Sequence, residues 1–364
     1  MSIHLNILGT SSSRPAKGRA VSGSWVDLPN GQLVVDCGEG FQHRVMDHNS
    51  VLKQHSIIPR FKPARLRAIL LTHGHLDHTW GVLPWLQTMA LDGRESPLMI
   101  IGPTSGSVID SFLTNEAPQA ESAVDLINQY QGWWSLSEGD FGYPINWILG
   151  DVESDRWLEF DPVNSEVIIH ESLPQPVDDA IISAIPTKHT VPSCAWSIRT
   201  CDRPGKFNRE LAKDLPMDVK NLLGKGEDAE YDGQILLAND FRGEPRQGHH
   251  LVISGDTAPN SIDTDTVDVL VHESTFCDDT EQLADSHLHS TARGAGSTAA
   301  KISAKHLVLT HYSARFDNLE VLLEQATAEH DSVSFSSDGD ILSITDQGIT
   351  HLHLDNDEWV NIIG

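Results

Sequence analysis

The sequence has few cysteines, few basic residues and no long apolar run. Its 364 residues include 4 cysteines, none of them in a CxxC pair, which excludes a disulfide-stapled scaffold. No stretch approaches the roughly 18 apolar residues that a membrane span requires. The first residues, MSIHLNILGT, lack the basic start and apolar run of a signal peptide. We therefore expect a cytoplasmic protein whose thiols are reduced.

Basic residues are outnumbered, with 25 Lys and Arg against 52 Asp and Glu, and the net charge is −27. Such a chain should repel nucleic acid as a whole. The charge is uneven, however, because residues 105–180 hold fifteen acids and a single base, a balance of −14. We interpret this tryptophan-rich segment as an acidic insertion region. Residues 203–225 are locally basic, with six bases against three acids, so the total charge does not exclude RNA binding.

Short aliphatic runs that end in polar residues recur along the chain. They occur in 4–13, 32–40, 66–78, 178–189, 250–257, 267–275 and 305–313. Helix-like stretches at 291–304 and 318–330 lie among them, and a hydroxyl near 290–291 is placed to cap the first. This alternation predicts an α/β layered fold that forms one domain over 1–364. Residues 203–234 break the pattern, with a helix-like middle interrupted at Pro216, and we expect a protruding arm with little core.

The segment His73-Gly74-His75-Leu76-Asp77-His78 follows the apolar run AILL directly. Neutral imidazoles and carboxylates are ligands that suit zinc. Residue alternation points His73 and His75 one way, while the loop turns Asp77 and His78 another way. One short loop can therefore serve two metal ions.

Other polar residues end predicted strands elsewhere in the chain, and Asp36 is one of them. Loops at one edge of a layered α/β sheet converge, so ligands distant in sequence can meet there. Seven candidates are about the number needed for two metals that share a carboxylate. They are His73, His75, Asp77, His78, His189, Asp256 and His311.

These motifs resemble the metallo-β-lactamase superfamily and, within it, the ribonuclease Z family of tRNA 3′-processing endonucleases. The resemblance covers most of the chain. It depends on LGTSSSRPAKGR (8–19), VVDCGEGFQHRVM (34–46), LLTHGHLDHTWGVLPWL (70–86), ISGDT (253–257), HESTF (272–276), HLHST (287–291) and LTHYSARF (309–316). It implies an αββα sandwich and removal of the 3′ trailer of precursor tRNA by a metal-activated water.

The same resemblance implies two zinc ions per subunit, with manganese or magnesium as alternatives. One ion would be held by His73, His75 and His189, and the other by Asp77, His78 and His311, with Asp256 bridging both. Asp77 would act as the base on the attacking water. His289, positioned by Glu273, would protonate the leaving ribose oxygen.

The resemblance also implies how RNA is held and how the protein assembles. Family members bind precursor tRNA through a basic loop and an arm, and act as homodimers in which one subunit's arm clamps tRNA at the other's active site. The corresponding substrate-binding residues here are Lys17, Arg19, Arg315, Lys206, Arg209, Lys213 and Lys220.

Two other functions are compatible with the sequence. The same metal chemistry would also hydrolyse a small or cyclic phosphodiester, which the acidic segment favours and the basic arm disfavours. A non-catalytic binding protein with this fold is the second alternative, although each ligand position and the proton donor are present.

Overall fold

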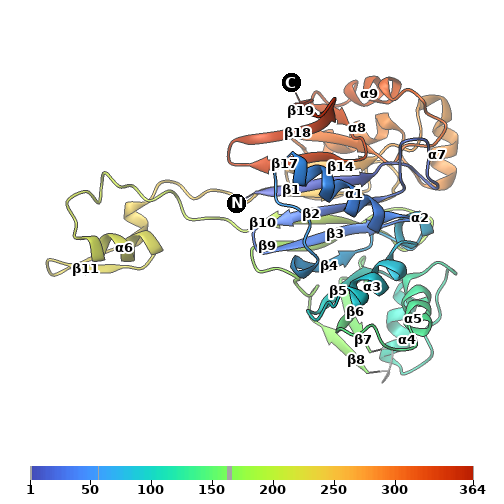
Figure 1. Cartoon of the computed structure of the whole chain (residues 1–364), viewed down its shortest axis with the longest axis horizontal. Coiled ribbons are helices and arrows are strands. Elements are labelled where there is room, and N and C mark those ends of the chain that lie inside the picture. The colour runs from blue at the N-terminus through green and yellow to red at the C-terminus, as the bar shows by residue number, and fades with distance from the viewer. Residues whose placement is uncertain (1, 56, 162–165, 364) are drawn as a thin grey trace.

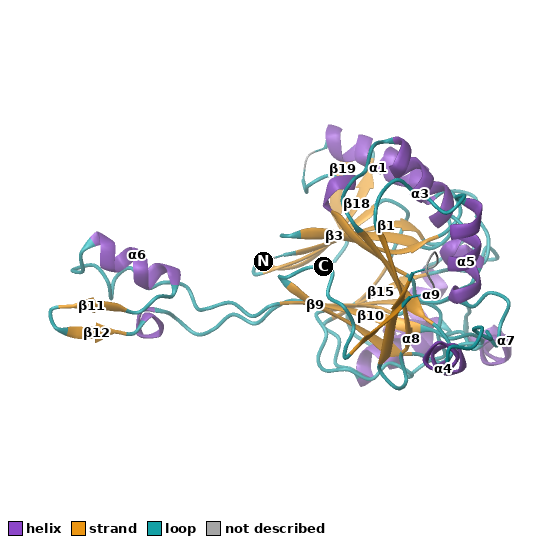
Figure 2. Ribbon diagram, turned by 90° about the horizontal axis from the view of Figure 1, so that it is seen from below, coloured by secondary structure: helices purple, strands orange, loops and turns teal. Residues whose placement is uncertain are grey.

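The computed structural model describes residues 2–55, 57–161 and 166–363. Within these residues, two large β-sheets face each other, and Figure 2 shows helices on their outer sides and an arm projecting from one end. Over these ranges, the first sheet has eleven strands. In spatial order they are β19 (Glu358–Asn361), β18 (Gly348–Asp355), β17 (Asp340–Thr345), β1 (Ile3–Gly9), β2 (Gly23–Leu28), β3 (Gly31–Cys37), β4 (Leu66–Leu70), β5 (Leu98–Pro103), β6 (Ile145–Asp151), β7 (Arg156–Phe160) and β8 (Val167–His170).

The second sheet has six strands among the described residues, and the four neighbouring strands on one side of it run parallel, while the other two pair antiparallel. In spatial order they are β16 (Val333–Phe335), β15 (His306–Thr310), β14 (Val269–Glu273), β13 (His250–Ile253), β10 (Cys194–Thr200) and β9 (Ala180–Pro186). Strands β3 to β6 of the first sheet are parallel as well. Parallel strands covered on both faces bury nearly every side chain, as in β14, where all five residues are buried.

Helices cover the outer face of each sheet. The helices of the body are α1 (Phe41–Gln54), α2 (Leu76–Thr79), α3 (Val82–Leu91), α4 (Gly106–Leu113), α5 (Leu126–Leu136), α7 (Glu281–His287), α8 (Ala292–Lys301) and α9 (Glu320–Thr327), with short 3-10 turns at Pro63–Arg65 and Asp278–Thr280. Helix α6 (Met217–Lys225) and the 3-10 turn Ala238–Phe241 belong to the arm instead. One core lies between α1, α3, α4, α5 and the first sheet, a second between the sheets, and a third under α8 and α9. This αββα sandwich confirms the predicted fold class.

The expected strands form, but each strand ends before the polar residues that close the predicted run. The run 66–78, for example, gives β4 only to Leu70, after which the metal-binding motif forms a loop and α2. The expected helix cap is present, because Thr291 Oγ1 accepts a hydrogen bond from Gly294 N at 3.0 Å at the start of α8.

The acidic segment 105–180 is built into one edge of the first sheet. It supplies α4, α5, β6, β7 and β8, and β6 pairs in parallel with β5 over six residues. Trp133, Trp147 and Trp157 are buried, so the segment packs into the hydrophobic cores of the body. Residues 162–165 of this segment lie outside the described part of the chain.

The arm stands clear of the body in both ribbon views (Figures 1 and 2). It extends beyond the predicted boundary at residue 234, because a hairpin of β11 (Ala229–Tyr231) and β12 (Gln234–Leu236) crosses that point. The returning chain pairs Arg246 with Arg203. Turns precede Pro216 and helix α6 follows it, and α6 packs on the hairpin around a small core of Val219, Leu223, Ala229 and Ala238.

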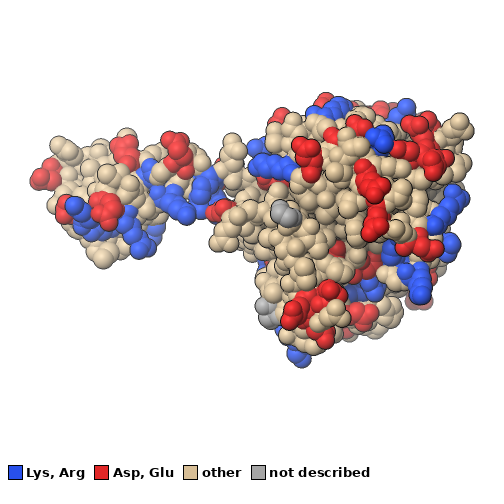
Figure 3. Space-filling model, turned by 90° about the horizontal axis from the view of Figure 1, so that it is seen from above, with Lys and Arg blue, Asp and Glu red and all other residues tan. Residues whose placement is uncertain are grey.

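Over 203–246 the arm carries eight basic and nine acidic residues, so the basic character of 203–225 does not cover all of it. Figure 3 shows both signs on the arm, with Lys and Arg side chains gathered at the end nearest the body. Across the described residues, the helices are all too short or too polar to span a bilayer.

Candidate metal centre

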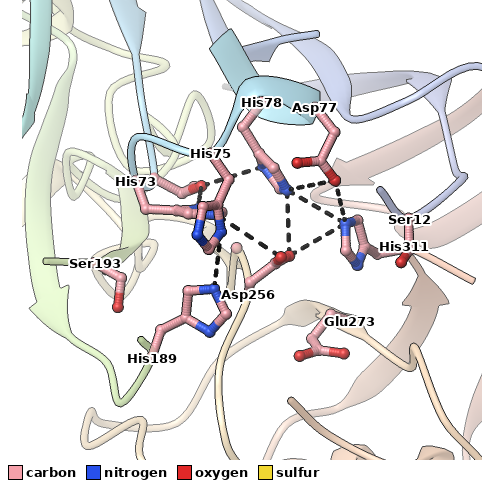
Figure 4. A network of polar contacts seen from close by, with 12 residues as sticks. Ser12, His73, His75, Asp77, His78, His189, Ser193, Asp256, Glu273 and His311 are labelled. Atoms are coloured by element: carbon pink, nitrogen blue, oxygen red, sulfur yellow. Dashed lines mark hydrogen bonds and ion pairs between the residues drawn. The ribbon is translucent and has the colours of Figure 1, made fainter. Parts of the chain in front are cut away.

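The seven predicted ligands meet at one edge of the sandwich, where strands of both sheets end. The loop after β4 carries His73 and His75, and α2 carries Asp77 and His78. The loops after β9, β13 and β15 supply His189, Asp256 and His311. Figure 4 shows these side chains directed toward a common centre.

Gly74 allows the first loop to pack closely on the acidic segment. A Cβ atom at Gly74 would lie 1.8 Å from the carbonyl oxygen of Val124, so a larger residue would displace the loop. Gln129 of α5 donates from Nε2 to the Gly74 carbonyl at 2.6 Å. The acidic segment therefore supports the ligand loop from behind.

One group of ligand atoms comprises His73, His75, His189 and Asp256. Nε2 of His73 lies 3.0 Å from Nδ1 of His75, which lies 3.2 Å from Nε2 of His189. The donor atoms of all four residues lie within 4.8 Å of one another. Ring nitrogens that face each other in this way are arranged to share one cation.

The second group comprises Asp77, His78, Asp256 and His311, whose donor atoms also lie within 4.8 Å of one another. Nε2 of His78 lies 3.2 Å from Nε2 of His311. Oδ2 of Asp77 is 3.7 Å from the first and 3.5 Å from the second of these nitrogens.

Asp256 belongs to both groups. Its Oδ2 faces Nε2 of His73 at 3.7 Å, while its Oδ1 lies 3.3 Å from Nε2 of both His78 and His311. Oδ1 is buried and has no hydrogen-bond partner. A buried carboxylate oxygen without a partner is costly, and a cation in each group would satisfy it. The residues present therefore fit a pair of metal ions.

A second layer of residues fixes the orientation of the imidazoles. Asp36 Oδ2 lies 2.7 Å from Nδ1 of His78, and Thr72 donates to the same carboxylate through its backbone N and Oγ1. Thr275 Oγ1 lies 3.0 Å from Nδ1 of His311. With Nδ1 engaged, both rings present Nε2 to the centre, which is how metal-binding histidines are commonly held.

Several of these residues adopt a strained backbone. Asp36, His311 and Leu288 have φ values of 58°, 58° and 53°, in the left-handed region that side chains other than Gly disfavour. Leu288 in this conformation offers its carbonyl oxygen to Nδ1 of His189 at 3.1 Å. The strain is thus concentrated where the ligands are positioned.

The electrostatics of the centre favour neutral imidazoles in one group and ionised carboxylates in both. Burial lowers the pKa values of His73, His75 and His189, which keeps their ring nitrogens unprotonated. Burial raises the pKa values of Asp77 and Asp256, but nearby histidines outweigh it and hold both well below the usual range.

His289 lies beside the ligands, between α7 and α8. Its Nδ1 is 2.8 Å from Oε1 of Glu273, and its Nε2 is 3.9 Å from Oδ2 of Asp256. Glu273 is fully buried and also accepts hydrogen bonds from the backbone N of Thr257 and of Ser290. Burial lowers the pKa of His289, but Glu273 and Asp256 outweigh it and raise the pKa to about 9. His289 is therefore arranged to carry a proton.

The structure brings the N-terminal basic loop to the centre. Ser13 N donates to Oδ2 of Asp77 at 2.7 Å. Lys17, four residues later in the same loop, is exposed to solvent. Arg19 instead lies over the ring of Tyr312 and donates to the Phe316 carbonyl at 3.0 Å, so its guanidinium braces the loop that carries the exposed Arg315.

The predicted basic residues of the arm lie far from the metal centre. The arm leaves after β10 and returns before β13, at the opposite ends of these strands from the metal-binding loops. Lys206, Arg209 and Lys213 are exposed, whereas Lys220 donates from Nζ to the Lys213 carbonyl at 2.7 Å within the arm.

Sequence reasoning missed the supporting residues Thr72, Thr275 and Gln129, and placed Asp36 only as a polar residue at a strand end. Each acts through a contact with a segment distant in sequence, such as the 42-residue separation between Asp36 and His78. The one available signal was that Asp36 ends a buried strand, as the ligands do.

Known proteins resemble this chain over nearly all of its length. A family model described as the metallo-beta-lactamase superfamily matches residues 17–89. A ribonuclease Z of Myxococcus xanthus is 31% identical over 336 residues, which is 90% of this chain and 93% of the relative. A ribonuclease Z of Methanosarcina acetivorans is 28% identical, covering 92% of this chain and 96% of the relative.

Solved structures share the fold. The short form of human tRNase Z has a TM-score of 0.55 at 20% identity, covering 93% of this chain and 98% of that one. The metallo-beta-lactamase fold protein YhfI of Bacillus subtilis has a TM-score of 0.56 at 18% identity, covering 94% and 100%.

Proposed function

The chain belongs to the ribonuclease Z family of the metallo-beta-lactamase superfamily, and we propose that it removes the 3′ trailer of precursor tRNA by hydrolysing one phosphodiester bond. The observation that carries the proposal is the pair of ligand groups joined by Asp256, with His289 and Glu273 beside them. Relatives that cover most of the chain are named ribonuclease Z, which supports an RNA substrate.

The seven ligand residues would hold two zinc ions, which when bound would activate water and polarise the phosphodiester. Asp77 would accept a proton from the attacking water, since its carboxylate stays ionised and faces the centre. His289 would donate a proton to the leaving ribose oxygen. Glu273 would keep Nδ1 of His289 occupied, so that Nε2 is the donating atom.

RNA binding would involve two separate surfaces. Lys17 and Arg315 would contact the phosphates near the cleavage site, and Lys206, Arg209 and Lys213 of the arm would contact a more distant part of the tRNA. Lys220 and Arg19 would act mainly by holding these loops in place. The arm and the centre lie at opposite ends of β10, which supports a homodimer in which one subunit's arm serves the other's centre. The expected cytoplasmic location belongs to the same proposal.

A specific observation favours the smaller substrate as a second candidate. A cavity of about 720 Å³ next to His189 is lined by Glu121, Asp151 and Glu153 of the acidic segment, as well as by Lys188. Asp151 is paired with Arg156 at 2.8 Å, but the carboxylates of Glu121 and Glu153 beside the centre would repel a long phosphate chain. This cavity favours a short trailer or a small phosphodiester.

One experiment separates the two candidates. The purified protein is given a 5′-labelled precursor tRNA and, separately, bis(p-nitrophenyl) phosphate, with Zn²⁺, Mn²⁺ or Mg²⁺ and with EDTA. We expect both to be hydrolysed only with metal and the Asp256→Asn variant to hydrolyse neither.

Excision of the arm tests whether the arm is needed for the tRNA reaction alone. Lys206 O and Gly243 N are hydrogen-bonded at 3.0 Å, so residues 207–242 can be replaced by a short glycine link. This excision should impair the tRNA reaction and spare the small ester. Equal loss of both reactions, or hydrolysis of the small ester alone by the intact protein, would contradict the tRNA assignment.

A further inference from the structure

The arm joins the body through a narrow stalk made of residues 201–207 and 241–249 (Figure 1). Arg203 and Arg246 exchange two backbone hydrogen bonds of 2.9 Å, and Gly243 N donates to Lys206 O at 3.0 Å. Arg242 Nη1 also donates to Gly205 O at 3.1 Å, and Gly248 N to Asp202 Oδ1 at 2.8 Å. Even with these bonds, a two-stranded ribbon is marginally stable on its own. Something beyond the ribbon must therefore set the direction in which the arm points.

The two arginines of the stalk are directly opposite each other in an antiparallel pair, so their side chains leave the ribbon on the same face. Like charges in such a position repel each other. His249, three residues after Arg246, lies at the same root, and its side chain is only 12% exposed. The root of the arm thus gathers basic groups that need a counter-charge.

Asp346 supplies that counter-charge. It lies in the turn between β17 and β18, and accepts hydrogen bonds from Arg203 Nη2 and from Arg246 Nη1, the latter at 3.1 Å. His249 Nε2 is 3.3 Å from Oδ1 of Asp346. Within the described residues, Asp346 is the one carboxylate in ion-pair range of either arginine.

A second carboxylate near the root, that of Asp268, is already engaged by other groups. Asp268 lies 3.8 Å from Nδ1 of His249, but it is engaged by Lys305 Nζ at 2.6 Å and by the backbone N of His250. Asp346 therefore links both strands of the stalk to the first sheet, at the end of the sandwich opposite the metal centre.

We propose that Asp346 is a positioning residue that fixes the direction of the arm and thereby strengthens the binding of precursor tRNA. This inference rests on the proposed function for its consequence, but not for its geometry. Without the carboxylate, two adjacent guanidinium groups would repel each other and the stalk would loosen. The change should weaken substrate binding and leave the chemical step unaltered, since Asp346 does not touch the centre.

The test compares Asp346→Asn, Asp346→Glu and the control Asp355→Asn, which changes an exposed carboxylate at the other end of β18. For Asp346→Asn, we expect the KM for precursor tRNA to rise about fivefold, the scale of a partly exposed ion-pair network, with kcat unchanged. Hydrolysis of bis(p-nitrophenyl) phosphate should not change. Asp346→Glu should recover most of the loss, and Asp355→Asn should match the original protein.

Two further measurements make the test specific. Amide hydrogen exchange of 203–207 and 241–246 should be faster in Asp346→Asn than in the control, because the stalk opens more often. When residues 207–242 are replaced by a glycine link, Asp346→Asn should add no further increase in KM. An unchanged stalk exchange rate, an unchanged KM, or a loss of kcat for both substrates would overturn the proposal. The exchange measurement uses no substrate, so it tests whether Asp346 stabilises the stalk even if the protein does not cleave precursor tRNA.

Discussion

Oδ2 of Asp36 lies 2.7 Å from Nδ1 of His78, and both side chains are buried. Asp36 comes from the end of β3 and adopts a φ of 58°, so the backbone is strained to place this carboxylate. The contact leaves Nε2 of His78 facing Asp256 and His311. The ligand set therefore depends on a residue that does not contact the proposed metal.

Replacing Asp36 with Asn should weaken metal binding without removing a ligand. Loss of the carboxylate leaves His78 free to turn or to change tautomer, and such changes typically lower metal affinity by about 10- to 100-fold. Competition with a chromophoric zinc chelator measures this directly. Asp27→Asn is a matched control, since Asp27 is buried beside Gln32 in the same sheet but away from the centre. Equal affinities for the two variants would contradict the role given to Asp36.

Replacing His289 with Gln should slow the chemical step while both metal ions stay bound. The side chain is assigned as proton donor to the leaving oxygen, a contribution that is typically worth about 10²- to 10⁴-fold in rate. Bis(p-nitrophenyl) phosphate releases nitrophenolate, which needs no proton, so its hydrolysis should be nearly normal. Loss of metal content, or an equal loss for both substrates, would show that His289 acts in another way.

Replacing Gln129 with Ala should reduce both reactions together. The side-chain amide of Gln129 holds the carbonyl oxygens of Gly74 and Val124, at 2.6 and 2.8 Å, and so fixes the loop that carries His73 and His75. We expect zinc affinity to fall, with parallel losses for precursor tRNA and the small ester. Gln131→Ala, on the same helix but away from the loop, is the control. A selective loss of the tRNA reaction would instead place Gln129 in RNA binding.

The stability of the protein should fall between pH 6.5 and pH 4 through two buried histidines outside the centre. Burial lowers the pKa values of His48 and His306 from 6.5 to about 4. Below pH 6.5 the unfolded chain binds protons that the folded chain does not, so acid favours unfolding until about pH 4. Each histidine contributes roughly 3 kcal/mol to this loss. Urea unfolding of His306→Asn should show a flatter dependence on pH than the original protein, and an identical dependence would contradict the assignment.

The sequence was sufficient to predict the layered fold and to collect the seven ligand candidates. Each of them follows a buried strand, and strand ends converge at one edge of a sheet, so local patterns located residues such as His189 and Asp256. The supporting contacts were out of reach because they join segments that only the folded chain brings together, as Thr275 and His311 do. The end of the arm was also misplaced, since the acidic hairpin after Gly226 has no sequence pattern that ties it to the basic helix before it.

The net charge of the acidic segment did not predict where that segment lies relative to the centre. Part of the acidic segment lies beside the centre, where Glu121 and Glu153 line a cavity next to His189, and another part supports the ligand loop through Gln129. The acidic segment therefore both supports the ligand loop and lines the cavity next to His189.

The most direct test of the account is the position of the attacking oxygen. Precursor tRNA is cleaved in water enriched in ¹⁸O with the zinc-loaded protein, and both products are analysed by mass spectrometry. Attack by water with protonation of the ribose oxygen by His289 predicts a tRNA that ends in a 3′-hydroxyl, and a trailer whose 5′-phosphate carries one ¹⁸O. A 2′,3′-cyclic phosphate on the tRNA, or a trailer without the label, would contradict it.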